Sequence, residues 1–347
     1  MSQSGPGITL AALAARVGAV VEGDGARRVA RVGTLENAGP DAIAFLANPK
    51  YRAQLATTRA GAVVVTPADA AATALPRLVA ADPYSVYARV AAVLHPPALP
   101  AAGIHPSAVV AASARVDAAA AVGAHAVVGE RAVVGPRAIV GAGTVIGADA
   151  EIGEGVTLHP NVSIYARCVI GPRTVVHSGA VIGADGFGMA EEGGQWLRIP
   201  QVGRVVIGAD CDIGANTTID RGAIDDTVIE DDVKLDNQIQ IGHNCRIGRH
   251  TAIAGCVGIA GSAHIGRNCK IAGAAGIGGH LSIADGTVIG AATAIVATID
   301  RAGVYTGMFP ALPHREWQKV AARLRRLDEL ADRVRALERA LAQRSPG

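Results

Sequence analysis

"AVVGPRAIVGAGTVIGADAEIGEGVTL", residues 132–158, repeats one pattern every six positions. Every sixth residue is a branched aliphatic: Val134, Val140, Ile146, Ile152 and Leu158. Continued in both directions, with two interruptions, this step of six counts 29 positions from Ile104 to Ile295, and each is Ile, Val or Leu. A repeat of this length indicates a solenoid.

An α-helix cannot use a period of six, because its turn of 3.6 residues does not divide that number. A short strand, a turn and another strand can. We therefore expect each hexad to form one flat face with its aliphatic pointing inward, and three faces to close a triangular coil of 18 residues. The 29 hexads then make nine to ten coils. At roughly 4.8 Å per coil the prism is about 45 Å long.

The residues around each aliphatic are also patterned. Gly follows it directly in 15 of the 29 hexads, and we interpret these glycines as positions where the backbone needs a positive φ. The residue two before the aliphatic is mostly small, which suits a tight corner. The pattern predicts a mainly β fold, a parallel β-helix.

Two interruptions break the step of six. The first is an insertion at residues 185–204, which holds Phe187 and Trp196, two of only five Phe or Trp in the chain. The second, between Ile219 and Ile229, is four residues longer than one hexad. Loops extruded from a solenoid often carry function, although a tolerated insertion explains them equally well.

The composition excludes several classes of function. Lys and Arg number 32 against 30 Asp and Glu, so no overall field favours nucleic acid. No run of about 18 apolar residues is present, and the first residues do not resemble a signal peptide. Five cysteines without a C-x-x-C pair suit reduced thiols, so we expect a cytoplasmic protein.

The chain divides into three parts. Residues 1–100 read as a small α/β domain, in which AIAFLAN and GAVVVTP are strands and KYRAQLATT is a helix between them. Residues 101–305 form the β-helix. Residues 306–347 contain a helix that starts near His314, carries an apolar stripe and has nine Lys or Arg against five Asp or Glu. This helix either bundles with partner helices or binds an acidic partner; the two are compatible.

Aromatic residues concentrate at FLANPKY, residues 45–51, in a chain that has few of them. Phe45 and Tyr51 flank Asn48. Two rings and an amide could hold a planar base. The alternative is that Phe45 belongs to the core and Tyr51 is an ordinary half-buried ring.

Among the ten histidines, His243 and His280 differ from the rest by their spacing of 37, or two coils plus one residue. They should lie along one edge of the prism, about 10 Å apart. That separation is too long for a nucleophile and its base but suits two ends of one cleft. His159 and His177 are 18 apart and should stack at one corner.

A neutral imidazole is a suitable base for taking a proton from an amine near neutral pH. Acyl transfer from a thioester also needs donors for the developing oxyanion, and the N–H of Gly261, one coil after His243, is a candidate. Cys245 repeats the hexad position of other cysteines and reads as a small filler rather than a nucleophile. No third ligand accompanies the histidine pair, so we expect no metal.

Several motifs together resemble one family, the UDP-3-O-acylglucosamine N-acyltransferases of lipid A biosynthesis. They are FLANPKY, DGFG, IPQVGRVVIG, NTTIDRGAIDDT, DNQIQIGHN and the C-terminal helix. The resemblance covers nearly the whole chain. It implies a left-handed β-helix, a homotrimer with active sites between prisms, and transfer of an (R)-3-hydroxyacyl chain from acyl carrier protein to the 2-amino group of a UDP-sugar. No cofactor is implied beyond the phosphopantetheine of the carrier protein.

The resemblance also implies roles for individual residues. His243 matches the general base and His280 a second active-site histidine. Phe45 and Tyr51 match rings that hold uracil, and Asn48 its edge, which favours the base-binding alternative for this patch. Asp236 and Asn244 lie in the same motif as His243 and match substrate-binding positions.

The small residues of GAATAIVAT, 290–298, lead us to expect a permissive end to the acyl-chain groove at Ala294. Two other classes compete with the N-acyltransferase. One is a related O-acyltransferase acting on UDP-GlcNAc, which would lack the first domain. The other is a non-catalytic β-helical scaffold, which would need neither the histidine pair nor the aromatic patch.

Overall fold

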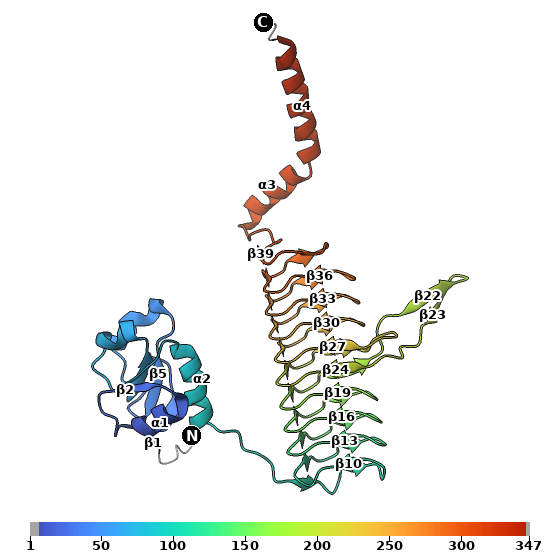
Figure 1. Cartoon of the computed structure of the whole chain (residues 1–347). Helices are drawn as coiled ribbons and strands as arrows, with labels where there is room; N and C mark the ends of the chain where they lie inside the picture. The colour runs from blue at the N-terminus through green and yellow to red at the C-terminus, as the bar shows by residue number, and fades with distance from the viewer. Residues whose placement is uncertain (1–6, 345–347) are drawn as a thin grey trace. The chain divides into compact units, whose positions relative to one another are not determined.

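The computed structural model describes residues 7–344 and divides the chain into two compact units, Met1–Leu99 and Pro100–Gly347 (Figure 1). The first unit is an α/β domain around a five-stranded sheet in the order β2-β7-β6-β5-β4. Its strands are β2 (Val20–Glu22), β4 (Arg31–Val32), β5 (Ala42–Phe45), β6 (Ala62–Val65) and β7 (Arg77–Val79), beside a small antiparallel pair, β1 (Ile8–Thr9) and β3 (Arg28–Val29).

Helices α1 (Leu10–Val17) and α2 (Pro83–Leu94) contribute Leu10, Leu13 and Val86 to the core of this unit. Thr9 caps α1, and Gly18 ends it in the left-handed conformation. The segment expected to be an α-helix, KYRAQLATT, forms instead the 3₁₀ helix η1 (Pro49–Ala56). Only Leu55 of η1 is buried, so no apolar stripe favours the α-helical period. A second 3₁₀ helix is η2 (Pro67–Ala72).

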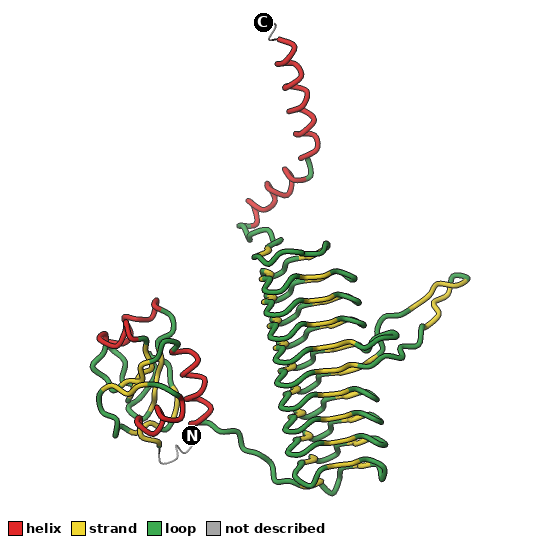
Figure 2. The backbone as a smooth tube through the Cα atoms, viewed as in Figure 1, coloured by secondary structure: helices red, strands yellow, loops and turns green. Residues whose placement is uncertain are grey.

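The second unit contains a left-handed parallel β-helix with three faces of 9, 11 and 10 strands, in keeping with the nine to ten coils expected (Figure 2). We name each face after one strand. The β28 face comprises β8 (Gly103–Ile104), β11 (Ala121–Val122), β14 (Ile139–Val140), β17 (Thr157–Leu158), β20 (Val175–Val176), β25 (Asp212–Ile213), β28 (Lys234–Leu235), β31 (Ala252–Ile253), β34 (Lys270–Ile271), β37 (Val288–Ile289) and β39 (Val304–Tyr305).

The chain passes next to the β29 face. It comprises β9 (Val109–Val110), β12 (Val127–Val128), β15 (Val145–Ile146), β18 (Ser163–Ile164), β21 (Val181–Ala184), β26 (Thr218–Asp220), β29 (Gln240–Ile241), β32 (Gly258–Ile259), β35 (Gly276–Ile277) and β38 (Ala294–Ile295). The β30 face comprises β10 (Arg115–Val116), β13 (Val133–Val134), β16 (Glu151–Ile152), β19 (Val169–Ile170), β24 (Val205–Ile207), β27 (Thr227–Ile229), β30 (Arg246–Ile247), β33 (His264–Ile265) and β36 (Ser282–Ile283).

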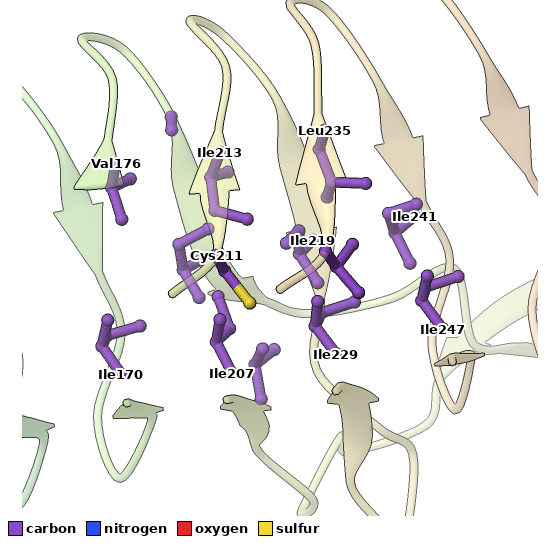
Figure 3. Close-up of a cluster of buried hydrophobic side chains, with 14 of the residues drawn as sticks. Ile170, Val176, Ile207, Cys211, Ile213, Ile219, Ile229, Leu235, Ile241 and Ile247 are labelled. Atoms are coloured by element: carbon purple, nitrogen blue, oxygen red, sulfur yellow. The ribbon is translucent and has the colours of Figure 1, made fainter. Parts of the chain in front are cut away.

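The repeated aliphatics form the core of the prism. Figure 3 shows Ile213, Ile219 and Ile229 converging from three faces, with Cys211 filling a corner between them. Each coil contacts only its neighbours, so the aliphatics stack in continuous columns. The prediction that one residue in six points inward is confirmed from Val122 onward; Ile104 is half exposed and Val110 and Val116 are partly buried.

The glycines that follow the aliphatics serve close packing, and the expectation that they provide a positive φ is wrong for most of them. A Cβ on Gly147 would lie 2.5 Å from the backbone nitrogen of Ala166 in the next coil, and the φ of Gly147 is not in the left-handed region. The left-handed residue comes two positions later, as at Asp149 (φ 57°) and Asn161 (φ 61°). Stacked backbones, rather than turn geometry, therefore select Gly in these hexads.

The first insertion forms a two-stranded hairpin, β22 (Met189–Glu192) and β23 (Gln195–Arg198), that projects from the prism (Figure 1). Gly193 and Gly194 make its two-residue turn, both with positive φ. Phe187 and Trp196 are 84% and 69% exposed, so neither belongs to the core.

The C-terminal segment forms two helices, α3 (His314–Leu324) and α4 (Leu327–Arg344), where one was expected. Most of the apolar stripe is exposed in the single chain, including Leu330 and Leu337. Within residues 7–344, no helix is both long and apolar enough to cross a membrane.

Candidate active site

The turns that lead from the β29 face to the β30 face stack along one edge, which we name the His243 edge. His243 follows β29, Gly261 follows β32 and His280 follows β35, and these three strands are neighbours in one sheet. The N–H of Ser262 donates to the carbonyl of His243 (2.8 Å), and that of His280 to the carbonyl of Gly261 (3.1 Å). The two histidines therefore share an edge two coils apart, as their spacing predicted.

Both insertions emerge at this same edge. The hairpin lies between β21 and β24, and the shorter insertion between β26 and β27, each a passage from the β29 face to the β30 face. Each contacts the His243 turn: the first insertion through Gly186 and the second through Ala223 and Asp225. The interruptions and the histidine pair thus belong to one local assembly.

The shorter insertion fixes the hydrogen on His243. The Asn244 amide nitrogen donates to the carbonyl of Asp225 (2.9 Å), and its Oδ1 accepts from the N–H of Ala223 (2.9 Å). Because these contacts orient the amide, Oδ1 also faces His243 Nδ1 at 2.9 Å as an acceptor. Nδ1 therefore carries the hydrogen of the neutral ring, and Nε2 keeps its lone pair for a proton.

Two glycines enclose the His243 ring. A Cβ on Gly261 would lie 2.6 Å from Nε2, and a Cβ on Gly186, in the DGFG turn of the first insertion, would lie 2.7 Å from the Cβ of His243. No side chain fits at either position. The imidazole is thereby held between two backbone segments, half-buried, with little room to rotate.

Gly261 leaves a backbone donor beside the base. Its N–H donates no hydrogen bond to any group within residues 7–344, while its carbonyl accepts from His280. A free N–H close to Nε2 can receive the oxygen of a carbonyl that is under attack. His280 is exposed, and its backbone is left-handed (φ 59°).

One carboxylate, Asp220, completes the edge on the other side of His243. It ends β26, one coil before His243, and its Oδ2 accepts from Gln240 Nε2 at 2.9 Å. Burial raises the pKa of the Asp220 carboxyl above its ordinary value, against opposing effects from the Gln240 hydrogen bond and the charge of His243.

Cys245 adjoins His243 but is fully buried in the core of the prism. Burial raises the pKa of its thiol to about 11. A thiol that stays protonated at neutral pH is a poor nucleophile, which agrees with its interpretation as a filler. In the part of the chain that the structure describes, no three His, Cys, Asp or Glu side chains are grouped to hold a metal ion.

Asp236 lies on a different edge, where the β28 face meets the β29 face; we name it the Asp236 edge. Its Oδ2 accepts from the N–H of Gly255 at 3.0 Å. It lines a groove of about 700 Å³ along the β28 face, together with His177, Lys234 and Lys270. The structure therefore does not bring Asp236 beside His243 within one chain, although both come from the DNQIQIGHN motif.

A strip without large side chains runs along the β29 face beyond His243; we name it the lane. The outward residues of β32, β35 and β38 are Gly258, Gly276 and Ala294, and they are paired in register. A Cβ added to Gly258 or Gly276 would meet nothing within 4 Å. Ala294 is exposed at the far end of this lane, where the sequence placed the end of the acyl-chain groove.

In the first unit, Phe45, Asn48 and Tyr51 line one cavity of about 430 Å³. Phe45 stacks on Tyr87 with ring centroids 4.0 Å apart, so one face of Phe45 is already covered. Asn48 Oδ1 accepts from the N–H of Lys50 (3.0 Å) and caps η1, which leaves its amide hydrogens available. The three residues are thus together, but only one face of Phe45 remains for a ligand.

Comparison with known proteins identifies the family. Residues 26–93 match the family model described as UDP-3-O-(3-hydroxymyristoyl) glucosamine N-acyltransferase, LpxD, and residues 149–184 and 226–261 match the bacterial transferase hexapeptide repeat. A UDP-3-O-acylglucosamine N-acyltransferase of Paraburkholderia phytofirmans is 50% identical over 98% of this chain and 95% of its own length. That of Paraburkholderia xenovorans is 53% identical over the same shares.

The chain belongs to the UDP-3-O-acylglucosamine N-acyltransferase family. Among solved structures, a UDP-N-acetylglucosamine acyltransferase is similar with a TM-score of 0.49 and 24% identity, covering 71% of this chain and 85% of that chain. The family model and the named relatives make the protein an acyltransferase, and its β-helix is built on hexapeptide repeats.

Against this family assignment, sequence reasoning missed two features of the site. Asp220 lies within NTTIDRGAIDDT, but it was not singled out from the sequence. The available signal was a carboxylate directly after an inward aliphatic, a position that holds Gly in 15 of the 29 hexads. Tyr84 and Tyr87 also went unremarked as neighbours of Phe45. Their spacing of three on a predicted helix, so that both rings lie on one face, could have indicated a shared contact.

Proposed function

We propose that the protein transfers an (R)-3-hydroxyacyl chain from acyl carrier protein to the 2-amino group of UDP-3-O-acylglucosamine, a step of lipid A biosynthesis. The observation that carries the proposal is the His243 ring, whose Nδ1 hydrogen is fixed by Asn244 so that Nε2 is a free base. The names and near-complete coverage of the relatives support the same substrates.

The reaction then needs no covalent enzyme intermediate. The amine nitrogen attacks the thioester carbonyl, His243 Nε2 takes a proton from that nitrogen, and the Gly261 N–H stabilises the oxyanion. The C–S bond breaks, and the phosphopantetheine thiolate leaves with the proton from His243. The enclosure of the ring by Gly186 and Gly261 supports this assignment, because a base must hold its geometry through the reaction.

The active unit in this proposal is a homotrimer with sites between prisms. Asp236 and His243 lie on different edges of one prism, and the groove beside Asp236 is open. A cleft between two chains would set the Asp236 edge of one chain opposite the His243 edge of the next. One substrate could then contact both residues, which supports a shared site.

The other partners follow from charge and shape. From Arg315 to Arg344 the chain has nine Lys or Arg against five Asp or Glu, which suits an acidic acyl carrier protein. The exposed apolar stripe of α3 and α4 suits bundling of these helices within the trimer. The cavity at Phe45, Asn48 and Tyr51 suits the uracil ring, and the lane ending at Ala294 suits the acyl chain. The five free cysteines support a cytoplasmic enzyme in this proposal. The proposed reaction uses no cofactor beyond the phosphopantetheine of the carrier protein.

The test is an assay of the full chain with 3-hydroxyacyl carrier protein and UDP-3-O-acylglucosamine, read out as amide product. We expect His243→Ala to lower kcat by at least about a hundredfold, the range for loss of a general base. Its matched control is His250→Ala, which removes an exposed imidazole from the edge where the β30 face meets the β28 face and should keep activity.

Three outcomes would contradict the proposal. Undiminished amide formation by His243→Ala would remove the base assignment. Absence of amide with the wild type, together with acylation of UDP-GlcNAc, would favour the O-acyltransferase alternative. Acylation of neither nucleotide would favour the alternative of a non-catalytic β-helical scaffold.

A further inference from the structure

Asp220 is one of four carboxylates that directly follow an inward aliphatic, with Asp117, Glu230 and Asp236, and of these four it alone lies on the His243 edge. It follows the inward aliphatic Ile219, the position that holds Gly in 15 of the 29 hexads. Its strand pairs with β29 in the register Thr218↔Gln240 and Ile219↔Ile241, so Asp220 lies one coil before the Gly242–His243 turn. On its other side it is paired with Ala184, which leads into the DGFG turn that contacts His243. Asp220 thus belongs to the His243 edge.

The contacts of Asp220 leave half of its carboxylate unused. Oδ2 accepts from Gln240 Nε2 at 2.9 Å, and the Gln240 Oε1 in turn accepts from the Thr218 hydroxyl, which fixes the orientation of the amide. Oδ1 has no hydrogen-bond partner within residues 7–344. One oxygen is therefore held in place and the other is free.

No cation neutralises Asp220 in the described chain. The neighbouring Arg221 is buried, and its guanidinium donates to the carbonyls of Gly183 and Ala166, both at 2.8 Å. The one charge that acts on Asp220 is that of His243 when its ring is protonated, and Gln240 is neutral. A half-buried carboxylate without a cation partner costs folding free energy, which argues against a purely structural ion pair.

Amide formation needs an acceptor that ester formation does not. A primary amine that attacks a thioester becomes an ammonium with two N–H bonds at the new tetrahedral centre. His243 Nε2 can take only one of these protons. The second N–H then needs an acceptor in a cleft from which water is excluded, because an unpaired charged donor there is costly. An attacking hydroxyl has a single O–H and makes no such demand.

We propose that Asp220 is a further catalytic residue, whose free Oδ1 accepts a hydrogen bond from the attacking 2-amino group while His243 removes its other proton. The proposal rests on the N-acyltransferase function proposed above and names the group that adapts its site to an amine. Gln240 then acts as a positioning residue, because it holds the second oxygen of the carboxylate.

The order of residues along the edge indicates from which side each substrate approaches His243. Asp220, His243, Gly261 and His280 occupy successive coils, spaced by roughly 4.8 Å. The amine acceptor lies on one side of the base, and the candidate oxyanion donor lies on the other. The sugar therefore approaches from the Asp220 side and the thioester from the Gly261 side, from which the lane to Ala294 continues.

The test compares Asp220→Asn with the wild type in steady-state assays of the full chain. Asn keeps an oxygen for Gln240 but replaces the charged acceptor, so we expect kcat/KM for the amino sugar nucleotide to fall about 10- to 100-fold, the size of a charge-assisted hydrogen bond. The KM for acyl carrier protein should stay the same. Asp117→Asn, an exposed carboxylate at the same hexad position but on the edge where the β30 face meets the β28 face, is the matched control and should remain within about twofold of the wild type.

A binding measurement separates amine recognition from general damage. By calorimetry, the wild type should bind UDP-3-O-acylglucosamine more tightly than the same nucleotide with an acetamido group, and Asp220→Asn should lose this difference. Asp220→Gly introduces the residue most common at this position, so it should fold and behave like Asp220→Asn.

Wild-type kinetics in both variants, or an equal rise in KM for both substrates, would overturn the role of Asp220. A wild type that forms no amide at all would instead overturn the proposed function, which makes the two failures distinguishable.

Discussion

Two pairs of histidines lie on edges of the same prism with opposite arrangements. His159 and His177 are one coil apart on the Asp236 edge, and their rings stack with centroids 4.7 Å apart and planes 10° apart. His243 and His280 are two coils apart on the His243 edge, and Gly261 lies between them. In the first pair, each ring packs against the other. The second pair is separated by the backbone of Gly261, which adjoins the His243 ring.

The supporting residues differ in the same way. His177 Nε2 contacts the half-exposed Asp212 at 3.2 Å, an ordinary surface contact. His243 is held by an oriented amide, two glycines and both insertions. The regular repeat of a solenoid makes its corners alike. A functional site forms where the repeat is interrupted and neighbouring turns enclose one side chain.

The largest effect should come from displacing the His243 ring with a side chain at Gly261. In Gly261→Ala the new methyl would lie 2.6 Å from His243 Nε2, so the ring must move. We expect kcat to fall about a hundredfold, as for a displacement near 1 Å of a reacting group. Gly25→Ala in the first unit is the control, because a Cβ there would make only an ordinary contact, 3.5 Å from the Cβ of Ala11. Equal activities of the two variants would contradict the assignment of Gly261 to the site.

The next effect tests how Asn244 differs from an ordinary turn residue. Asn244→Ala removes the acceptor for His243 Nδ1, and the lost hydrogen bond of about 1 kcal/mol should lower kcat roughly fivefold. Asn268→Ala is matched, since Asn268 is also left-handed (φ 56°) but lies on the third edge.

Both of these variants should lose about 1 kcal/mol of stability, because Ala disfavours the left-handed conformation. Thermal unfolding and kinetics measured together would therefore separate the two. If Asn268→Ala lost as much activity as Asn244→Ala, the amide would have no special role at His243.

A smaller effect is expected at the end of the lane on the β29 face. Ala294→Met should shift the preference toward shorter acyl chains by a few-fold, since each buried methylene contributes about 0.8 kcal/mol. Competition between acyl carrier proteins of different chain length measures this shift. Ser282→Met, an exposed position on the β30 face, should leave the preference unchanged. An unchanged preference in Ala294→Met would remove Ala294 from the groove.

The sequence predicted the prism well because one constraint, an aliphatic at every sixth residue, recurs in 29 hexads and leaves few alternatives. It also placed His243 and His280 on one edge, since phase in a solenoid translates directly into position. The expectation that these glycines provide a positive φ was wrong, because the contact between stacked backbones that selects them cannot be seen in a single hexad. Local patterns cannot show what the next coil, 18 residues away, brings close.

The same limit explains what was missed at the site. Asn244 acts through Ala223 and Asp225, about 20 residues earlier, and Gly186 reaches His243 from an insertion 57 residues away. These contacts depend on where irregular loops leave the prism, which periodicity does not describe. The family resemblance supplied residue identities there, and the structure adds which atoms face one another.

The smallest effect concerns the stacked pair and depends on pH. Burial and the charge of His177 lower the pKa of His159, whereas Asp212 acts in the opposite direction. A histidine whose pKa is lowered on folding contributes its full stability above its unfolded value near 6.5, and that contribution is lost as the pH falls through this value. In His159→Gln the drop in melting temperature between pH 7.5 and pH 5.5 should shrink by about 1–2 °C relative to the wild type. His125→Gln, at an exposed corner of the same edge, should keep the wild-type drop. An unaltered drop in His159→Gln would show that the stack tolerates its proton, and His159 and His177 would then no longer contrast with the catalytic pair in being a closed, neutral contact.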